Sequence, residues 1–410
     1  RITINPGIRF VHIRGDLPRS FDEAPFQPKL GIAPRFGITI DIFGDHSTVF
    51  KAHYGRYYHQ MRDLMYTYWE PRGTKQKFIW DADAGDWELD FEDPWEPYTI
   101  DPDLKFPYMR QFVLGLEREL GRDISVSAAF IYRTNHDLMD KVNITGMWEE
   151  VQWIDPYEGN THNVYRRLNP GENAYYVTNP YKGQGQDIGA AFPGIVPWDP
   201  ERSNRTLELR FNKRYSNGWQ FRASFIHGYS WGNDDNMWGD PGSSHSSALG
   251  ASWNFSNPNF QINAEGPLTY SSTYIFKTVG SYDIPVIDVT LGFDFRLESG
   301  DRYTKQIMLD PDIDPDSTVP WWDQDITIFA EKRGSNKLPG MKILNLRAEK
   351  FFQFGNNMRL AVLFDVFNVF NWDTVTWVET LSDPWSEFQF GFVWDIQNMR
   401  TWKLGFRFEF

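Results

Sequence analysis

The last twelve residues, 399–410, constrain the fold of this chain more than any other stretch. Side chains alternate between the two faces of a β-strand. One face of this segment is therefore apolar (Trp402, Leu404, Phe406, Phe408 and Phe410) and the other is polar (Lys403, Gly405, Arg407 and Glu409). Soluble proteins seldom place their most apolar strand at the terminus, because chain ends fray into water. The pattern is typical of the closing strand of an outer-membrane β-barrel, with one face toward lipid and the other toward a polar lumen.

The composition agrees with a barrel. Aromatic residues make up 17% of the chain, yet its mean hydropathy of −0.53 is that of a soluble protein. Only alternate residues of a membrane strand need to be apolar. No apolar run approaches the roughly 20 residues of a spanning helix, which excludes a helical membrane protein. The net charge of −14 argues against a nucleic-acid partner. The absence of cysteine excludes disulfides and thiolate metal sites.

Twelve segments show strand character, and tight turns alternate with long loops between them. Strands of about 11 to 13 residues, tilted near 40°, span roughly 30 Å. The sequence predicts an all-β fold: an antiparallel transmembrane β-barrel portion in one domain over 1–410, with short periplasmic turns and long extracellular loops. The predicted strands are residues 2–13, 35–43, 47–58, 109–119, 124–133, 205–214, 218–229, 273–280, 286–297, 342–352, 358–370 and 399–410.

Alternation within these strands predicts which side chains face the lumen. In 286–297, Ile287, Val289, Leu291, Phe293 and Phe295 are expected outward, and Asp288, Thr290, Gly292 and Asp294 inward. Most charged lumen residues are expected to pair across strands as structural elements, and in a receptor they would contact a plug or water. The main lumen-facing candidates are Arg210, Arg222, Asp288, Asp294, Arg347 and Asp365.

Most of the 18 Trp residues fall in the predicted loops. Exposed aromatic rings stack on sugars or peptide side chains, which makes them candidates for ligand contact. The alternative is that those near strand ends form an interfacial girdle and the others pack the loops together. The candidates are Trp69, Trp80, Trp87, Trp95, Trp148, Trp153, Trp321, Trp322 and Trp385.

The run DPDIDPD places Asp310, Asp312, Asp314 and Asp316 at alternating positions, as in a Ca²⁺ site. An EF-hand loop would also need a glycine at its sixth position and a glutamate at its twelfth, and both are missing. Two prolines keep the run extended, so a solvated acidic loop is the favoured interpretation over calcium. Enzyme signatures such as H-E-x-x-H, G-x-S-x-G and the P-loop are absent, and no catalytic residue is predicted.

Two internal stretches resemble the barrel of TonB-dependent outer-membrane receptors: PKLGIAPRFGITIDIFGDHSTVFKAHYGRYYHQ (28–60) and NMRLAVLFDVFNVFNW (357–372). The closing GFRFEF (405–410) is similar to the family's terminal strand. The Trp-rich acidic loops are most similar to the Oar-like branch, whose members often carry a carboxypeptidase-regulatory-like domain.

The resemblance implies a 22-stranded barrel around an N-terminal plug preceded by a TonB-binding box. This chain would then be the C-terminal part of the barrel, with plug and box absent from it. Its implied partners are outer-membrane lipid, the barrel-insertion machinery through the terminal strand, and TonB through the missing N-terminal region. The implied function is energy-coupled uptake of a bulky nutrient (glycan, peptide or chelate) across the outer membrane of a Gram-negative bacterium.

Two other classes stay open: a self-contained passive channel of twelve strands, and a soluble glycan-binding β-protein. Pairing of the first strand with the last would indicate a barrel closed at twelve. Burial of Phe406, Phe408, Ile287 and Phe293 between two layers would contradict the membrane assignment.

Overall fold

The computed structural model describes most of the chain, including every long strand. Among these residues the only helix is the 3-10 turn η1 (Pro258–Gln261), and no helix is long and apolar enough to cross a membrane. The described residues are 1–12, 30–59, 75–81, 85–93, 99–156, 158–172, 174–179, 199–234, 257–268, 273–309, 327–355, 358–382 and 388–410.

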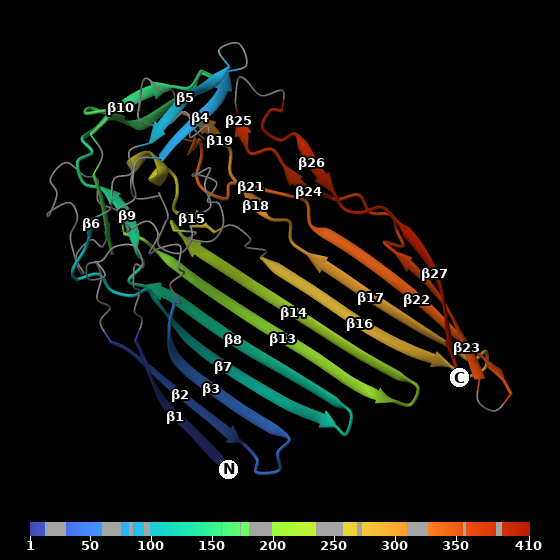
Figure 1. Ribbon diagram of the computed structural model, residues 1–410. Coiled ribbons are helices and arrows are strands. Elements are labelled where there is room, and N and C mark those ends of the chain that lie inside the picture. The colour runs from blue at the N-terminus through green and yellow to red at the C-terminus, as the bar shows by residue number, and fades with distance from the viewer. Residues whose placement is uncertain are drawn as a thin grey trace.

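Twelve long strands form one antiparallel sheet, in which each strand pairs with the next long strand along the chain (Figure 1). They confirm the twelve predicted segments, with ends that differ by a few residues. Their bounds are β1 (Ile2–Val11), β2 (Gly31–Asp41), β3 (Thr48–Tyr58), β7 (Tyr108–Gly121), β8 (Ile124–His136), β13 (Arg202–Ser216), β14 (Trp219–Gly232), β16 (Tyr274–Ile284), β17 (Val289–Glu298), β22 (Met341–Phe354), β23 (Met358–Phe367) and β27 (Thr401–Glu409).

Tight turns join the long strands at one end of the sheet, where both chain termini also lie (Figure 1). The turn between β13 and β14 shows why so few residues suffice. Asn217 and Gly218 have φ angles of 53° and 79°. A two-residue turn with both φ angles positive matches the right-handed twist of the flanking strands, and Asn-Gly is the preferred pair for it.

The turn between β16 and β17 differs from the prediction. Ser281, Tyr282 and Asp283 continue β16 and pair with Gly292, Leu291 and Thr290 of β17. The chain turns only at 285–288, because Pro285 has no N–H for the ladder and Asp288 adopts a φ of 56°. Ile287 and Asp288 therefore lie in the turn, and the prediction that they belong to the strand is wrong.

The register gives the sheet two chemically distinct faces. On β27 and β23, Phe406 lies opposite Val362 and Leu404 opposite Phe364, whereas Arg407 lies opposite Ala361. The same alternation continues from strand to strand, so we call these the apolar face and the charged face. Phe406 and Phe408 are 66% and 53% exposed. The apolar face is therefore uncovered by a second layer, as expected of a surface that meets lipid.

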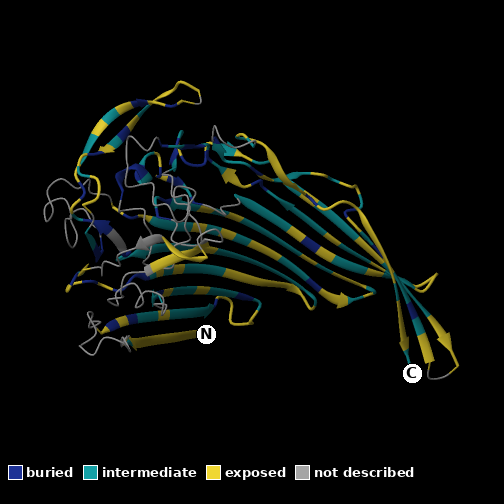
Figure 2. Ribbon diagram, turned by 45° about the horizontal axis from the view of Figure 1, so that its top comes forward, coloured by how far each residue is buried: buried dark blue, intermediate teal, exposed yellow. Residues whose placement is uncertain are grey.

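The sheet is open. In the described sheet β1 pairs with β2 and β27 with β23, and no hydrogen-bonded ladder joins β1 to β27. Figure 2 shows β1 exposed along nearly its whole length. The twelve strands therefore do not close on themselves, which contradicts the alternative of a barrel complete at twelve.

At the other end, the long loops contain secondary structure that the sequence did not predict. Two hairpins stand out, β4 (Lys75–Asp81) with β5 (Asp86–Asp93), and β10 (Trp148–Ile154) with β11 (Thr161–Arg167). The other short strands are β6 (Thr99–Ile100), β9 (Asp140–Asn143), β12 (Tyr175–Thr178), β15 (Gly266–Pro267), β18 (Arg302–Tyr303), β19 (Gln306–Met308), β20 (Thr327–Phe329), β21 (Asn336–Lys337), β24 (Val375–Val378), β25 (Leu381–Ser382) and β26 (Val393–Ile396).

These loops pack against one another over a small apolar core. Its buried members are Trp153, Val164, Ile307, Leu309 and Ile328, from loops that are distant in sequence. A polar clamp adds to this core. The Asn259 side chain is fully buried, accepts a 2.7 Å hydrogen bond from the Tyr165 N–H and donates a 2.8 Å bond to the Tyr165 carbonyl. The loop end of the sheet is thus a folded layer.

Candidate functional site

The charged face carries a ladder of ion pairs. Arg347 forms two parallel hydrogen bonds with Asp365 on the neighbouring strand, Nε to Oδ1 at 2.6 Å and Nη2 to Oδ2 at 3.0 Å. Lys51 Nζ on β3 and Glu117 Oε2 on β7 lie 2.7 Å apart. Glu117 is two residues beyond Gly115, the register partner of Lys51. Other pairs on this face are Arg407–Glu349, Arg407–Glu409, Arg359–Glu409, Arg210–Glu208 and Arg296–Glu298. These pairs hold the long side chains against the charged face, and their remaining donors and acceptors are open to water.

The register places five of the six lumen-facing candidates on the charged face. They are Arg210, Arg222, Asp294, Arg347 and Asp365. Asp288 is the sixth, and it lies in the β16–β17 turn. Of the five, Asp365 is the most buried, because the Arg347 fork covers both of its carboxylate oxygens.

Replacing Arg347 by alanine is expected to destabilise the folded protein by about 1 to 2 kcal/mol. The change leaves the Asp365 carboxylate without its bidentate partner, but Arg347 is half-exposed and water compensates in part. Urea unfolding of the full-length protein in vesicles measures the effect. The double variant Arg347→Met/Asp365→Leu is the control, since it removes both charges together, and it should recover most of the loss. Equal losses in the single and double variants would contradict this role.

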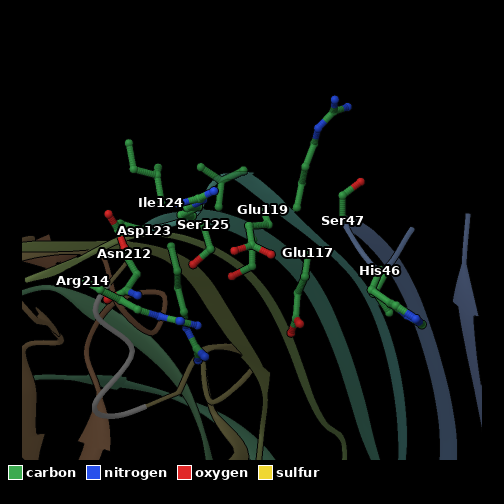
Figure 3. A pocket seen from close by; sticks show the side chains of 15 residues that line it. His46, Ser47, Glu117, Glu119, Asp123, Ile124, Ser125, Asn212 and Arg214 are labelled. Atoms are coloured by element: carbon green, nitrogen blue, oxygen red, sulfur yellow. The ribbon is translucent and has the colours of Figure 1, made fainter. Parts of the chain in front are cut away.

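A hollow of about 370 Å³ lies at the tight-turn end of the charged face. Figure 3 shows the side chains around it, which come from the β2–β3 and β7–β8 turns and from β3, β7, β8 and β13. Its wall mixes both signs of charge, with Glu117, Glu119 and Asp123 opposed by Arg122 and Arg214. A mixed, hydrated wall of this kind suits contact with a polar protein surface better than it suits an apolar small molecule.

Two of the predicted ligand-contact tryptophans meet at the tip of the β4–β5 hairpin. Trp80 and Trp87 are directly paired and pack edge to face, with ring centroids 5.5 Å apart. Their exposed fractions are 48% and 61%. The pair presents aromatic surface to solvent at the loop end of the molecule.

Trp148 and Trp153 both pack against other residues of the loops. The Arg167 guanidinium lies 4.9 Å from the centroid of the Trp148 ring. Trp153 is buried in the loop core beside Val164, which leaves little of its ring accessible to a ligand. Its burial is explained by its packing in the cluster that contains Ile307, Leu309 and Ile328 from other loops. The remaining tryptophan candidates lie outside the described residues: Trp69, Trp95, Trp321, Trp322 and Trp385.

Sequence reasoning missed an exposed aromatic group on the β24–β26 hairpin. Trp377 and Trp394 stack with centroids 5.7 Å apart, and Phe388 and Phe392 pack against Trp394. Alternation in 374–378 and 392–396 was a usable signal, because Trp377 and Trp394 each lie between polar or β-branched neighbours typical of a strand.

The candidate calcium ligands Asp310, Asp312, Asp314 and Asp316 lie outside the described residues. Within the part of the chain that the structure describes, no group of three or more His, Asp or Glu side chains could hold a metal ion.

Phe406, Phe408 and Phe410, the proposed terminal signal, project from the apolar face at the tight-turn end.

Comparison with known proteins gives one family match. A model described as "Outer membrane beta barrel domain" matches residues 7–291. Among curated proteins, the uncharacterized protein YddB of Escherichia coli K12 is 25% identical over 150 residues, which are 35% of this chain and 15% of YddB.

One solved structure supports the fold, and a second has a lower similarity. The outer membrane transporter YddB from Escherichia coli superposes with a TM-score of 0.53 at 14% identity, covering all of this chain and 43% of the transporter. The FrpB iron transporter from Neisseria meningitidis (F3-3 variant) has a TM-score of 0.47 at 13% identity, over all of this chain and 42% of FrpB. The chain thus spans less than half the length of these structures.

Proposed function

Because the chain belongs to the outer membrane β-barrel domain family, we propose that it forms part of the wall of a TonB-dependent receptor that takes up a bulky nutrient. Its location is the outer membrane of a Gram-negative bacterium. The observation that carries the proposal is the open twelve-stranded sheet, with one face exposed and apolar and the other charged. Such a sheet has the architecture of a segment of a larger barrel.

In this proposal the chain is the C-terminal part of a 22-stranded barrel of the Oar-like branch. Further strands would pair with the free edges of β1 and β27. A plug and TonB box outside this chain would supply gating and energy coupling. The charged face, including the hollow beside Glu117 and Arg214, would contact the plug or water. The barrel-insertion machinery would recognise the terminal strand through Phe406, Phe408 and Phe410.

Ligand capture is assigned to the folded layer of loops. The exposed pairs Trp80–Trp87 and Trp377–Trp394 supply aromatic surface that stacks on sugar rings or apolar side chains. We propose no catalytic role and no resident cofactor, with calcium at Asp310–Asp316 as a weaker proposal. A soluble glycan-binding protein is disfavoured, because Phe406 and Phe408 would stand uncovered in water.

Uptake assays in the native host test this function. A strain lacking the gene is expected to lose growth on one class of large nutrient, given as the only carbon, nitrogen or iron source: a glycan, a peptide or a ferric chelate. Restoring the gene should restore growth, and a protonophore should abolish uptake of the labelled nutrient into the periplasm. Uptake that persists after the proton-motive force collapses would support a passive channel instead.

A further inference from the structure

The apolar face has an unexpected charge asymmetry. Although the chain carries a net charge of −14, no Asp or Glu occupies this face within the twelve described long strands. The carboxylates of these strands lie on the charged face, for example Glu117, Glu208 and Asp365. The apolar face carries only basic ionisable groups besides tyrosine and two histidines: Arg56, Arg110, Arg118, Arg205, Lys213, Lys342 and Lys350.

These basic residues occupy two levels. On three strands a pair is separated by eight positions: 110 and 118 on β7, 205 and 213 on β13, 342 and 350 on β22. Eight residues of a strand tilted near 40° correspond to about 21 Å along the membrane normal. The apolar band of a barrel is about 25 Å tall. Both levels therefore fall at the boundary between hydrocarbon and headgroups, where flexible basic side chains reach out of the acyl layer.

At the loop-side level two arginines face each other directly. Arg56 on β3 and Arg110 on β7 are register partners. Like charges at opposed positions of an antiparallel pair destabilise a sheet. None of the ion pairs among the described residues includes Arg56, Arg110 or Arg205. Among the described residues, no carboxylate forms an ion pair with either guanidinium group.

A buried tyrosine holds both arginines in place. The Arg56 guanidinium lies 4.2 Å from the centroid of the Tyr108 ring, and Arg110 Nη2 donates a 2.9 Å hydrogen bond to the Tyr108 hydroxyl. Tyr58 and His136 pack against the same ring. Arg56 Nη1 bonds weakly to the Ile32 carbonyl and the Tyr58 hydroxyl, while its Nε is shielded from solvent without a hydrogen-bond partner. The site is therefore preorganised, and the exposed Arg110 guanidinium can donate to a ligand.

The surrounding charge favours an anion. Beyond the end of β8, Asp137 has its pKa raised by burial, while Lys105, Arg56 and Arg110 act on that pKa in the opposite direction. One carboxylate thus stands among three cations. Arg205 is exposed on the same face two strands from β7 and adds a further positive charge. Planar guanidinium forks match phosphate oxygens in pairs, so phosphate is the anion that this geometry selects.

We propose that Arg56 and Arg110 bind the phosphate of a lipid headgroup in the loop-side leaflet of the outer membrane. The lipid is held with its acyl chains along the apolar face and its phosphate against the two guanidinium groups. A lipid phosphate is favoured over a soluble anion because the two arginines lie on the apolar face, at the level of the headgroups. The site does not open onto the charged face. The inference does not depend on what the barrel transports.

Native mass spectrometry of the full-length protein in detergent tests the site. The probes are bis-phosphorylated lipid A and its dephosphorylated form with the same acyl chains. The wild-type protein is expected to retain the phosphorylated form at least tenfold more strongly. Equal retention of the two forms would overturn the proposal, and this comparison requires no variant to fold. Displacement of the lipid by an equal concentration of inorganic phosphate would also overturn it, in favour of a free-anion site.

Variants then assign the residues. Arg56→Gln/Arg110→Gln is expected to lower retention of phosphorylated lipid A about tenfold, and Arg56→Lys/Arg110→Lys to lower it less. The matched control, Arg9→Gln/Lys277→Gln, removes two positive charges near the same level from the opposite face and should bind like wild type. If the Arg56/Arg110 glutamine variant binds like wild type, or the control loses as much, these arginines are not the site.

Discussion

Arginine at position 128 is expected to destabilise the protein by about 1 to 2 kcal/mol, whereas arginine at position 129 should be nearly neutral. The two positions are adjacent alanines near the middle of β8, both half-buried. They differ only in the face on which they lie. The comparison therefore isolates the cost of a charge in lipid from any change in residue type, size or strand position.

The register explains the expected difference. Ala128 lies between Leu116 and Leu209 on the apolar face, one apolar position inside the level of Arg118, so an arginine there enters the hydrocarbon. Ala129 lies between Gly115 and Glu208 on the charged face. Gly115 leaves room for the larger side chain, and the Glu208 carboxylate is opposite. A charge that remains in water next to an acid costs little.

Urea unfolding of the two full-length variants in vesicles, followed by tryptophan fluorescence, measures both free energies of unfolding. The yield of heat-modifiable protein in outer membranes is a second readout, and it should fall for Ala128→Arg alone. Equal destabilisation by the two changes would mean that the faces have been assigned wrongly, and a larger loss at 129 would reverse the assignment.

Residues 1–410 expressed alone are expected to aggregate and not to insert as a monomer. Both edges of the twelve-stranded sheet are unpaired in the structure. In hydrocarbon no water replaces the missing partners, and each unsatisfied backbone group costs several kcal/mol. With a row of such groups along both β1 and β27, the total exceeds the stability of an ordinary domain.

The measurement is insertion of purified, refolded protein into lipid vesicles, scored by heat-modifiable migration and protease protection. The full-length protein serves as the positive control under the same conditions. A monomeric, protected 1–410 segment would show that the edges find partners within the segment. In that case the proposal of a larger barrel would fail, although the family and the membrane location would stand.

Strand positions could be predicted from the sequence because a wall between lipid and water imposes a two-residue period on every strand. In 109–119, Phe112, Leu114 and Leu116 were expected on one face, and the register places them there. The period continues along the twelve long strands, with register shifts near the tight-turn ends of β7 and β13. The same period constrains the register, because a slip of one residue between neighbouring strands would turn side chains such as Arg347 toward the hydrocarbon.

Turns and loops were harder to predict, for different physical reasons. The β16–β17 turn was placed too early because Ser281-Tyr282-Asp283 has turn-like composition, although it also satisfies the alternation of a strand. Loop packing depends on contacts between distant segments, such as Trp153 with Ile307 or Asn259 with Tyr165. Periodicity within one segment contains no information about such contacts, so the burial of Trp153 could not be predicted from it.

The eight-residue interval between basic residues on β7, β13 and β22 has a consequence for membrane matching. It fixes the hydrophobic thickness that the protein fits, at a value below that of an average bilayer, in keeping with the thin outer membrane of bacteria. In lipids with longer acyl chains, Arg110 and Arg118 could not both reach headgroups. The bilayer would have to thin around the barrel or the strands would have to stand more upright, and short-chain lipids should therefore gather around it.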